Sequence, residues 1–241
     1  MSYHDASMRL LDCQMPVSVA AQIDIAEAER RLGVRLPRSI REWYSYENGM
    51  AILAEHSNED PPIEVRNFVL LEWQSHRLLP IRNENQGVSV WAVELDGSDD
   101  PGVWVDIDSN GKQWYRLATS FSVYVYTCIW DYRQVLKREA LVQAQHRTLS
   151  GAELAFLSRH FTEEPRTYGW PGSVQYRFGD ESAAILIWVV EHQADWFIAA
   201  ETEASLKEAV STVWLLDGLG GELYECSILG KRVLEGIRGR A

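Results

Sequence analysis

The amino-acid sequence predicts an α+β fold organised as two units. Helix patterns occur between residues 17 and 49, and from residue 63 the pattern changes to the alternation that strands show. A second helix pattern begins near residue 150 and again precedes strand patterns. We therefore expect one unit over residues 1–145 and a C-terminal α+β extension over 146–241. No Pro/Gly/Ser-rich linker separates them, so the sequence leaves open whether the extension folds alone or packs with the first unit.

Two helices are expected in the first unit before any strand. The Ala- and Glu-rich segment 17–32 is followed by Gly33, which suits the left-handed conformation of a helix C-terminal cap. Ser39 and Glu42 then have the spacing of a capping box, which predicts a short helix ending at Asn48-Gly49. The inner face of this helix is predicted from apolar side chains at helical spacing, namely Ile40, Trp43 and Tyr44.

Strand patterns follow in the first unit. Segments 63–73 and 89–96 have β composition, and in 103–108 apolar Val103, Val105 and Ile107 alternate with Trp104, Asp106 and Asp108. Ser109-Asn110-Gly111 supplies hairpin turn chemistry, so 113–118 is expected to return as an antiparallel partner. Apolar residues at helical spacing then predict a helix from Phe121 to Leu136.

The C-terminal extension repeats the order of helix and then strands. Ser150 and Glu153 form a second capping-box pattern, and Pro165 is expected to stop the helix that they begin. The remaining elements are predicted as strands at 174–178, 183–190 and 196–200, a helix at 204–216 and a last strand at 222–226.

Composition excludes several classes of function. The chain of 241 residues has a formal net charge of −12, which argues against direct nucleic-acid binding because a phosphate footprint needs clustered positive charge. Its longest uncharged run, residues 117–130, is shorter than the roughly 20 residues of a membrane-spanning helix. The N-terminus lacks the apolar stretch of a secretory signal, and the three cysteines are far apart. These features predict a cytoplasmic protein without disulfides.

Negative charge is concentrated in one segment. No Lys or Arg occurs between Arg82 and Lys112, whereas seven carboxylates do. The seven are Glu84, Glu94, Asp96, Asp99, Asp100, Asp106 and Asp108. Such a run is either a solvated surface or a face that meets a basic partner or a cation.

No catalytic or metal-binding motif is complete. Residues 106–111 match the first six positions of a calcium loop, but Leu117 stands where the bidentate Glu is required and the flanks alternate as strands. This segment is therefore interpreted as an acidic hairpin tip. The six histidines lack metal-ligand spacing, and neither a Walker P-loop nor a GxSxG motif is present. We expect no catalytic residue, no metal and no cofactor, although a site assembled from separate strands stays open.

The tryptophans fall into two groups. Trp43, Trp188 and Trp214 stand in apolar periodic contexts and are expected in the core. Trp91 and Trp104 stand on strand faces that carry or border the carboxylates. They suit either an interface that buries aromatic rings beside basic groups of a partner or packing beneath the second half of the chain.

Several short motifs together resemble one protein family. They are Leu-Gly-Val-Arg-Leu-Pro at 32–37, Trp43-Tyr44, Asn48-Gly49, a strand with Trp91, and Asp99-Asp100-Pro101 before the strand at 103–105. In this order they resemble the SUKH superfamily, which includes fungal cell-wall-assembly regulators and bacterial immunity proteins. The resemblance covers residues 17–140 and ends with the helix that begins at Phe121.

The resemblance implies an antiparallel-dominated central sheet flanked by helices, and a protein that binds other proteins rather than turning over a substrate. Bacterial members are paired with secreted toxins, often nucleases, whose basic surfaces suit an acidic binder. We therefore expect a non-enzymatic bacterial immunity protein of a toxin pair, with no cofactor. The expected partner-facing residues are Trp91, Glu94, Asp96, Asp99, Asp100, Trp104, Asp106 and Asp108. The alternatives are a regulatory or scaffold protein of the same fold, or an enzyme with a site between the two halves.

Overall fold

The computed structural model describes residues 2–57, 60–108, 110–170, 172–180 and 182–239. It divides the chain into two compact units, Met1–Trp130 and Asp131–Ala241. Each unit contains helices and one antiparallel sheet, so the α+β prediction is confirmed. Strand β6 (Ala140–Arg147) belongs to the second sheet, so the division lies after Trp130 and not after residue 145, where the sequence placed it.

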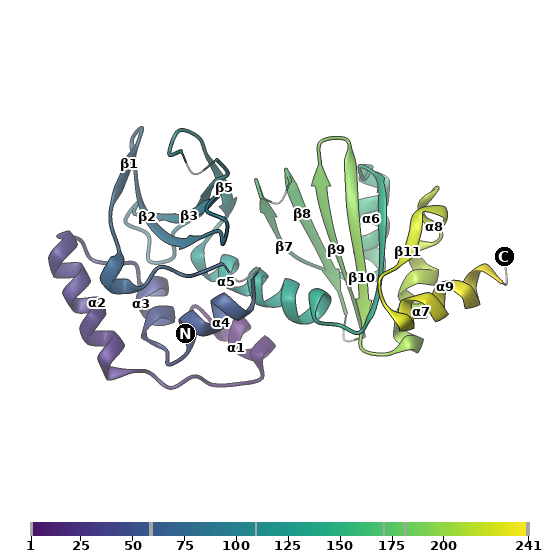
Figure 1. Cartoon of the computed structure of the whole chain (residues 1–241), viewed down its shortest axis with the longest axis horizontal. Helices are drawn as coiled ribbons and strands as arrows, with labels where there is room; N and C mark the ends of the chain where they lie inside the picture. The colour runs from purple at the N-terminus through teal and green to yellow at the C-terminus, as the bar shows by residue number, and fades with distance from the viewer. Residues whose placement is uncertain (1, 58–59, 109, 171, 181, 240–241) are drawn as a thin grey trace. The chain divides into compact units, whose positions relative to one another are not determined.

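The first unit places helices on one face of a five-stranded antiparallel meander, ordered β1-β2-β3-β4-β5 (Figure 1). Its helical elements are α1 (Asp5–Leu11), α2 (Val19–Leu32), α3 (Arg38–Ser45), α4 (Gly49–Glu55), the 3-10 turn η1 (Val65–Asn67) and α5 (Phe121–Trp130). Its strands are β1 (Leu71–Trp73), β2 (His76–Asn83), β3 (Val90–Glu94), β4 (Val103–Asp106) and β5 (Trp114–Ala118). The core between helices and sheet contains Ile40, Trp43, Tyr44, Val93, Val105 and Phe121.

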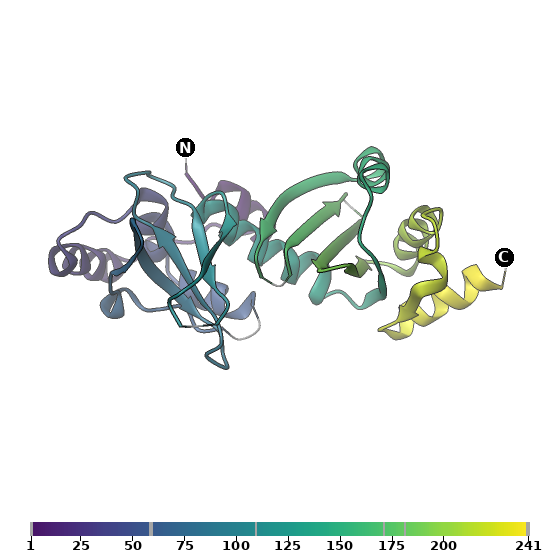
Figure 2. The ribbon, with the colours of Figure 1, turned by 90° about the horizontal axis from the view of Figure 1, so that it is seen from above.

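The second unit is a six-stranded antiparallel sheet ordered β11-β6-β10-β9-β8-β7. Besides β6 its strands are β7 (Thr162–Tyr168), β8 (Val174–Gly179), β9 (Ala183–Val190), β10 (Gln193–Ala200) and β11 (Leu223–Glu225). Its helical elements are the π-helix η2 (Asp131–Leu136), α6 (Gly151–His160), α7 (Glu203–Val213), α8 (Leu219–Glu222) and α9 (Ile228–Arg238). Figures 1 and 2 show α6, α7 and α9 on one side of this sheet.

The π-helix η2 packs on the opposite side of the second sheet from those helices. On β8, Tyr176 and Phe178 contribute to the core under α6 and α7, whereas Arg177 between them points the other way. Arg177 forms two hydrogen bonds of 2.6 and 2.7 Å with the carboxylate of Asp131, the first residue of η2. Since Arg177 is 3% exposed, this pair fixes the end of η2 against the sheet.

Several predicted helices and strands are confirmed, together with the residues that predicted where they begin, turn or end. Gly33 caps α2 in the left-handed conformation, with φ of 66°, and Asn48 has φ of 65°. Strand β4 pairs with β5 as the hairpin pattern predicts, although Ser109 lies outside the described residues. The helix predicted from Phe121 to Leu136 is α5 followed by η2.

The capping box predicted at Ser39 is wrong. Helix α3 begins at Arg38 after Pro37, so Ser39 is already inside the helix and its Oγ atom has no partner among the described residues. Glu42 instead accepts hydrogen bonds from the backbone amides of Tyr3 and His4, at 3.2 and 3.3 Å. A carboxylate at this position stabilises the start of α1, where amide groups have no partner within the helix.

Two other local predictions are wrong, namely one continuous strand over 63–73 and a helix that ends at Pro165. Segment 63–73 is not one strand, since η1 interrupts it and only β1 pairs in the sheet. Pro165 does not stop α6, which ends at His160. It lies in the edge strand β7, where a register shift spans Glu164 to Thr167. Edge strands tolerate proline because one side of the strand forms no sheet hydrogen bonds.

Candidate binding face of the first sheet

The outer face of the first sheet carries a second apolar cluster, on the side away from the helices. Leu78, Ala92 and Trp114 are buried in it, and Trp73 and Trp104 pack over them. The alternation of β3 and β4 explains this second cluster, because neighbouring residues on a strand point to opposite faces. Both faces of this sheet are therefore apolar, and the outer cluster is closed by tryptophan side chains that remain partly exposed.

Three rings are packed together at the surface of this cluster. Trp73 and His76 are cross-strand partners on either side of the β1–β2 turn, and their rings stack with centroids 5.3 Å apart. The ring of Trp104 lies 5.7 Å from Trp73 and 5.1 Å from His76. We call Trp73, His76, Trp104 and the carboxylate of Glu94 the aromatic cluster.

Glu94 fixes the orientation of two of these rings. One carboxylate oxygen lies 2.6 Å from Nδ1 of His76, and the other accepts a hydrogen bond of 3.0 Å from Nε1 of Trp104. Nε1 of Trp73 donates to the backbone oxygen of Lys112 at 3.1 Å. One nitrogen of each ring is thus hydrogen-bonded within the protein, and these bonds hold the apolar surfaces of the rings in fixed positions.

The chemistry of the aromatic cluster suits binding. Tryptophan is among the residue types enriched at the positions that contribute most to the affinity of protein interfaces. Both oxygens of Glu94 are already engaged, and its side chain is only 21% exposed. Within the described part of the chain, no three His, Cys, Asp or Glu side chains are grouped so that they could hold a metal ion.

The structure brings together only some of the residues that the sequence singled out. Glu94 and Trp104 lie in the aromatic cluster, but Trp91 is 5% exposed and points into the helix-facing core. Asp106 is 2% exposed, and its oxygens accept hydrogen bonds from the amides of Asp108 and Gly111. Trp91 and Asp106 therefore do not contribute to a partner-facing surface, because burial removes them from it.

Three of the four remaining carboxylates, those of Asp96, Asp99 and Asp100, have local structural contacts. Asp100 accepts a hydrogen bond of 3.0 Å from the amide of Ser122 near the start of α5, and Asp99 lies 3.4 Å from Arg38. Asp96 is exposed and accepts from the amide of Ser98, and Asp108 is exposed on the β4–β5 loop. The predicted acidic face is thus reduced to Asp96 and Asp108 as exposed groups without a basic partner in the described residues.

Sequence reasoning missed Trp73 and His76. The sequence pattern predicts one strand over residues 63–73 and assigns His76 to no element. The β1–β2 turn makes the two rings cross-strand neighbours, and Gln74 in this turn has φ of 52° although it is neither the Gly nor the Asn that usually marks a tight hairpin in a sequence.

Comparison with known proteins identifies one family. The sequence profile of the SMI1 / KNR4 family (SUKH-1) matches residues 20–127, which lie within the first unit and include every residue of the aromatic cluster. No curated protein and no solved structure matches the chain. In the described residues no helix has the length and apolar character needed to cross a bilayer.

Proposed function

Because residues 20–127 belong to the SMI1/KNR4 family of the SUKH superfamily, we propose that this chain is a non-enzymatic protein-binding module of the bacterial immunity type. It neutralises a cognate toxin domain in the cytoplasm of the cell that makes both proteins. The observation that carries this proposal is the aromatic cluster, in which Glu94 holds His76 and Trp104 in fixed positions at the surface of the sheet.

The aromatic cluster supports binding in preference to catalysis. A general acid or base must reach a substrate proton, whereas the two oxygens of Glu94 face side chains of the protein itself. Pre-organised rings lose little conformational entropy when a partner covers them, so they contribute efficiently to affinity. The center of the interface is therefore assigned to Trp73 and Trp104.

Charge supports a basic partner. The chain has a net charge of −12, and Asp96 and Asp108 are exposed on loops that follow β3 and β4. A toxin domain that acts on nucleic acid presents a basic surface for phosphates, and an acidic protein is steered toward such a surface. The carboxylates act at the rim, where they accelerate association, while the rings act at the centre.

The test starts with affinity capture of the full chain from the strain that produces it, followed by binding kinetics with the captured toxin domain. The variant Trp104→Ala should raise the dissociation rate, and Asp96→Lys/Asp108→Lys should lower the association rate and its salt dependence. The control Asp24→Lys/Glu208→Lys makes the same change of net charge at exposed positions on α2 and α7. Recovery of no toxin domain, or equal effects of the two charge reversals, contradicts the proposal.

The second candidate is a regulatory or scaffold protein with two binding functions. The observation that favours it is the second unit, which has a core of its own and lies outside the matched family segment. A toxin gene immediately upstream supports the immunity function, whereas a conserved neighbourhood without toxin genes supports the scaffold.

A further inference from the structure

The N-terminal residues form a segment that covers part of the helical layer of the first unit. Residues 2–11 contain helix α1, which packs against α5 (Figure 1), and residues 12–18 lead on to α2. The inner side of this segment is buried, with exposed fractions of 0% for His4, 1% for Ser7 and 3% for Met8. We call residues 2–11 the N-terminal strap. It is attached through His4 and one side of a helix of 7 residues.

The imidazole of His4 is fully enclosed by the first unit. It lies between the rings of Trp43 and Phe121, whose centroids are 4.9 and 5.7 Å from its own. Its Nε2 atom is 2.9 Å from the backbone oxygen of Ser39, which can only accept, so Nε2 carries the proton of the neutral ring. Nδ1 is buried and has no hydrogen-bond partner among the described residues. A second proton, on Nδ1, would therefore be buried without an acceptor.

Three carboxylates act on His4, and each of them favours its protonation. Glu42 belongs to α3, Asp100 precedes β4 and Asp5 lies on α1, whereas α5 contains no Asp, Glu, Lys, Arg or His. Glu42 already accepts from the amide of His4 at 3.3 Å, and Asp100 from an amide near the start of α5 at 3.0 Å. Burial outweighs the three carboxylates and keeps the pKa of His4 below 6.5. The neutral ring is thus the form that fits the docked strap.

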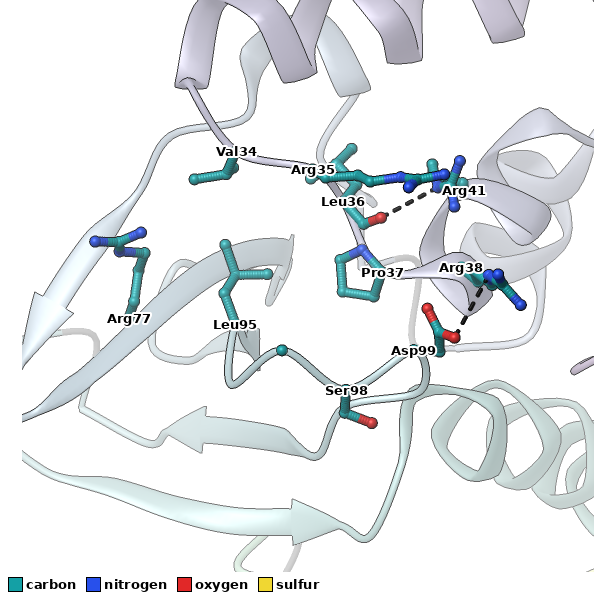
Figure 3. Close-up of a pocket in the computed structure, with 11 residues that line it drawn as sticks. Val34, Arg35, Leu36, Pro37, Arg38, Arg41, Arg77, Leu95, Ser98 and Asp99 are labelled. Atoms are coloured by element: carbon teal, nitrogen blue, oxygen red, sulfur yellow. Dashed lines mark hydrogen bonds and ion pairs between the residues drawn. The ribbon is translucent and has the colours of Figure 1, made fainter.

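The surface under the N-terminal strap is held by contacts that do not involve the strap. The amide of Ser39, near the start of α3, donates to the backbone oxygen of Asp99 at 2.9 Å. Figure 3 shows the ion pair of Arg38 with Asp99, at 3.4 Å, and the hydrogen bond of 3.1 Å from Arg41 to the backbone oxygen of Leu36. Helix α3 is therefore fixed to its neighbours whether or not the strap is docked.

We propose that the N-terminal strap is a pH-sensitive element, which detaches from α3 and α5 when His4 is protonated while the sheet of the first unit stays folded. In the detached strap, Nδ1 of His4 is exposed to water and takes up a proton without the cost of burial. Residues 2–11 contain no strand, so their release breaks no sheet hydrogen bond. Detachment uncovers the rings of Trp43 and Phe121.

This conformational change goes beyond the proposed function. It is assigned to a segment that lies outside the aromatic cluster and outside the matched family residues 20–127. Its trigger is a histidine that binding of a partner at the aromatic cluster does not involve.

The test is hydrogen exchange of the full chain, measured by mass spectrometry on one peptide that covers α1 and another that covers β3. Urea concentrations below the unfolding transition are compared. Exchange of the α1 amides should be nearly independent of urea, whereas exchange of the β3 amides should accelerate steeply, because detachment of the strap exposes much less surface than unfolding of the sheet. As the pH falls below 6.5, protection of the α1 amides should decrease by up to about tenfold per pH unit.

Three variants identify the trigger. His4→Gln keeps a donor for the Ser39 carbonyl but does not titrate, so the pH dependence of α1 protection should be lost. The control His192→Gln removes an exposed histidine of the second unit and should leave this pH dependence unchanged. Met8→Ala removes a buried apolar side chain of the strap, so it should lower α1 protection at every pH and keep the pH dependence.

Two results overturn the proposal. If the α1 and β3 amides of the wild type show equal urea dependence, the strap opens only when the whole unit unfolds. If the pH dependence of α1 protection persists in His4→Gln, another group is the trigger. The first comparison requires no substitution, so the proposal can be overturned even if His4→Gln does not fold.

Discussion

The guanidinium carbon of Arg82 lies 5.0 Å from the centroid of the Trp91 ring, and both side chains are buried, with exposed fractions of 4% and 5%. Arg82 also donates to the carboxylate of Asp60 at 2.8 Å and to the hydroxyl of Tyr124 at 2.6 Å. Burial opposes its charge, but the neighbouring Tyr124, Cys128 and Asp60 hold the pKa of Arg82 above its ordinary value. Trp91 thus covers a buried ion pair within the first unit.

Replacing Arg82 by Met should strongly destabilise the first unit. The substitution leaves the Asp60 carboxylate, whose side chain is 7% exposed, without its cation. Breaking a buried pair in this way costs about 3–5 kcal/mol in the free energy of unfolding. Hydrogen exchange of the β2 and β3 amides in the full chain measures the loss for this unit separately. Asp60→Asn added to Arg82→Met should recover part of it, and no recovery would show that Asp60 is not the cause.

Trp91→Ala should mainly lower stability, whereas Trp104→Ala should mainly weaken binding. Removing the core ring of Trp91 should lower the free energy of unfolding by about 3–5 kcal/mol. Removing the half-exposed ring of Trp104 should cost less stability but weaken binding of the proposed toxin partner by about 2 kcal/mol or more, as expected for a central interface residue. Hydrogen exchange and binding titration of both variants check this. If the Trp91 variant is stable but fails to bind, Trp91 belongs to the binding face and the assignment to the core is contradicted.

The sequence correctly predicts that side chains of β3 and β4 alternate between the two faces of the sheet. It does not reveal which of these faces the helices cover. Trp91 and Trp104 both have apolar neighbours, and only the tertiary arrangement buries the first in the core and leaves the second at the surface. Strand β2 was missed for a different reason. Leu78, Leu79 and Ile81 are apolar without alternation because both faces of the strand are covered, and Pro80 lies at a bulge.

Helix α9 was missed because its two glycines lower the helix propensity that the sequence displays. The structure explains why one of these positions, residue 230, is glycine. A Cβ atom on Gly230 would lie 2.2 Å from the backbone oxygen of Leu141, so only glycine allows α9 to approach β6 this closely. Close approach between distant segments is a tertiary property, and a propensity calculated along the chain does not contain it.

Acidification should destabilise the first unit in two steps. Burial lowers the pKa of His4 below its ordinary 6.5, although Ser39, Glu42, Asp100 and Asp5 oppose this. As the pH falls through 6.5, the unfolded chain therefore binds a proton that the folded chain does not, and the free energy of unfolding decreases, by at most about 1.4 kcal/mol per pH unit.

The second step involves Glu42. Burial alone would raise the pKa of Glu42, but hydrogen bonds from Ser2 and the Tyr3 amide hold this pKa below its ordinary 4.5. Its contribution to stability is present above pH 4.5 and is lost as the pH falls below that value. Hydrogen exchange of unit 1 amides at several pH values measures both steps. His4→Gln, which keeps a donor for the Ser39 carbonyl, should remove the first step only. A first step that persists in this variant would assign it to another group.

Ser39 and Ser150 are each followed three residues later by Glu, which is the spacing of a capping box. Substitution of these serines by alanine should nevertheless have different effects on stability. Ser150 Oγ accepts from the amide of Glu153, whose carboxylate accepts from the Ser150 amide at 2.7 Å, so both halves of the capping box are formed. Ser150→Ala should therefore destabilise α6 by about 1 kcal/mol. Ser39 Oγ is buried without a partner among the described residues, so Ser39→Ala removes an unsatisfied hydroxyl and should leave the stability of α3 unchanged or higher.

Hydrogen exchange of the α3 and α6 amides compares the two variants. A loss of about 1 kcal/mol on Ser39→Ala would mean that the Ser39 hydroxyl is hydrogen-bonded in solution, and α3 would then begin with a true cap.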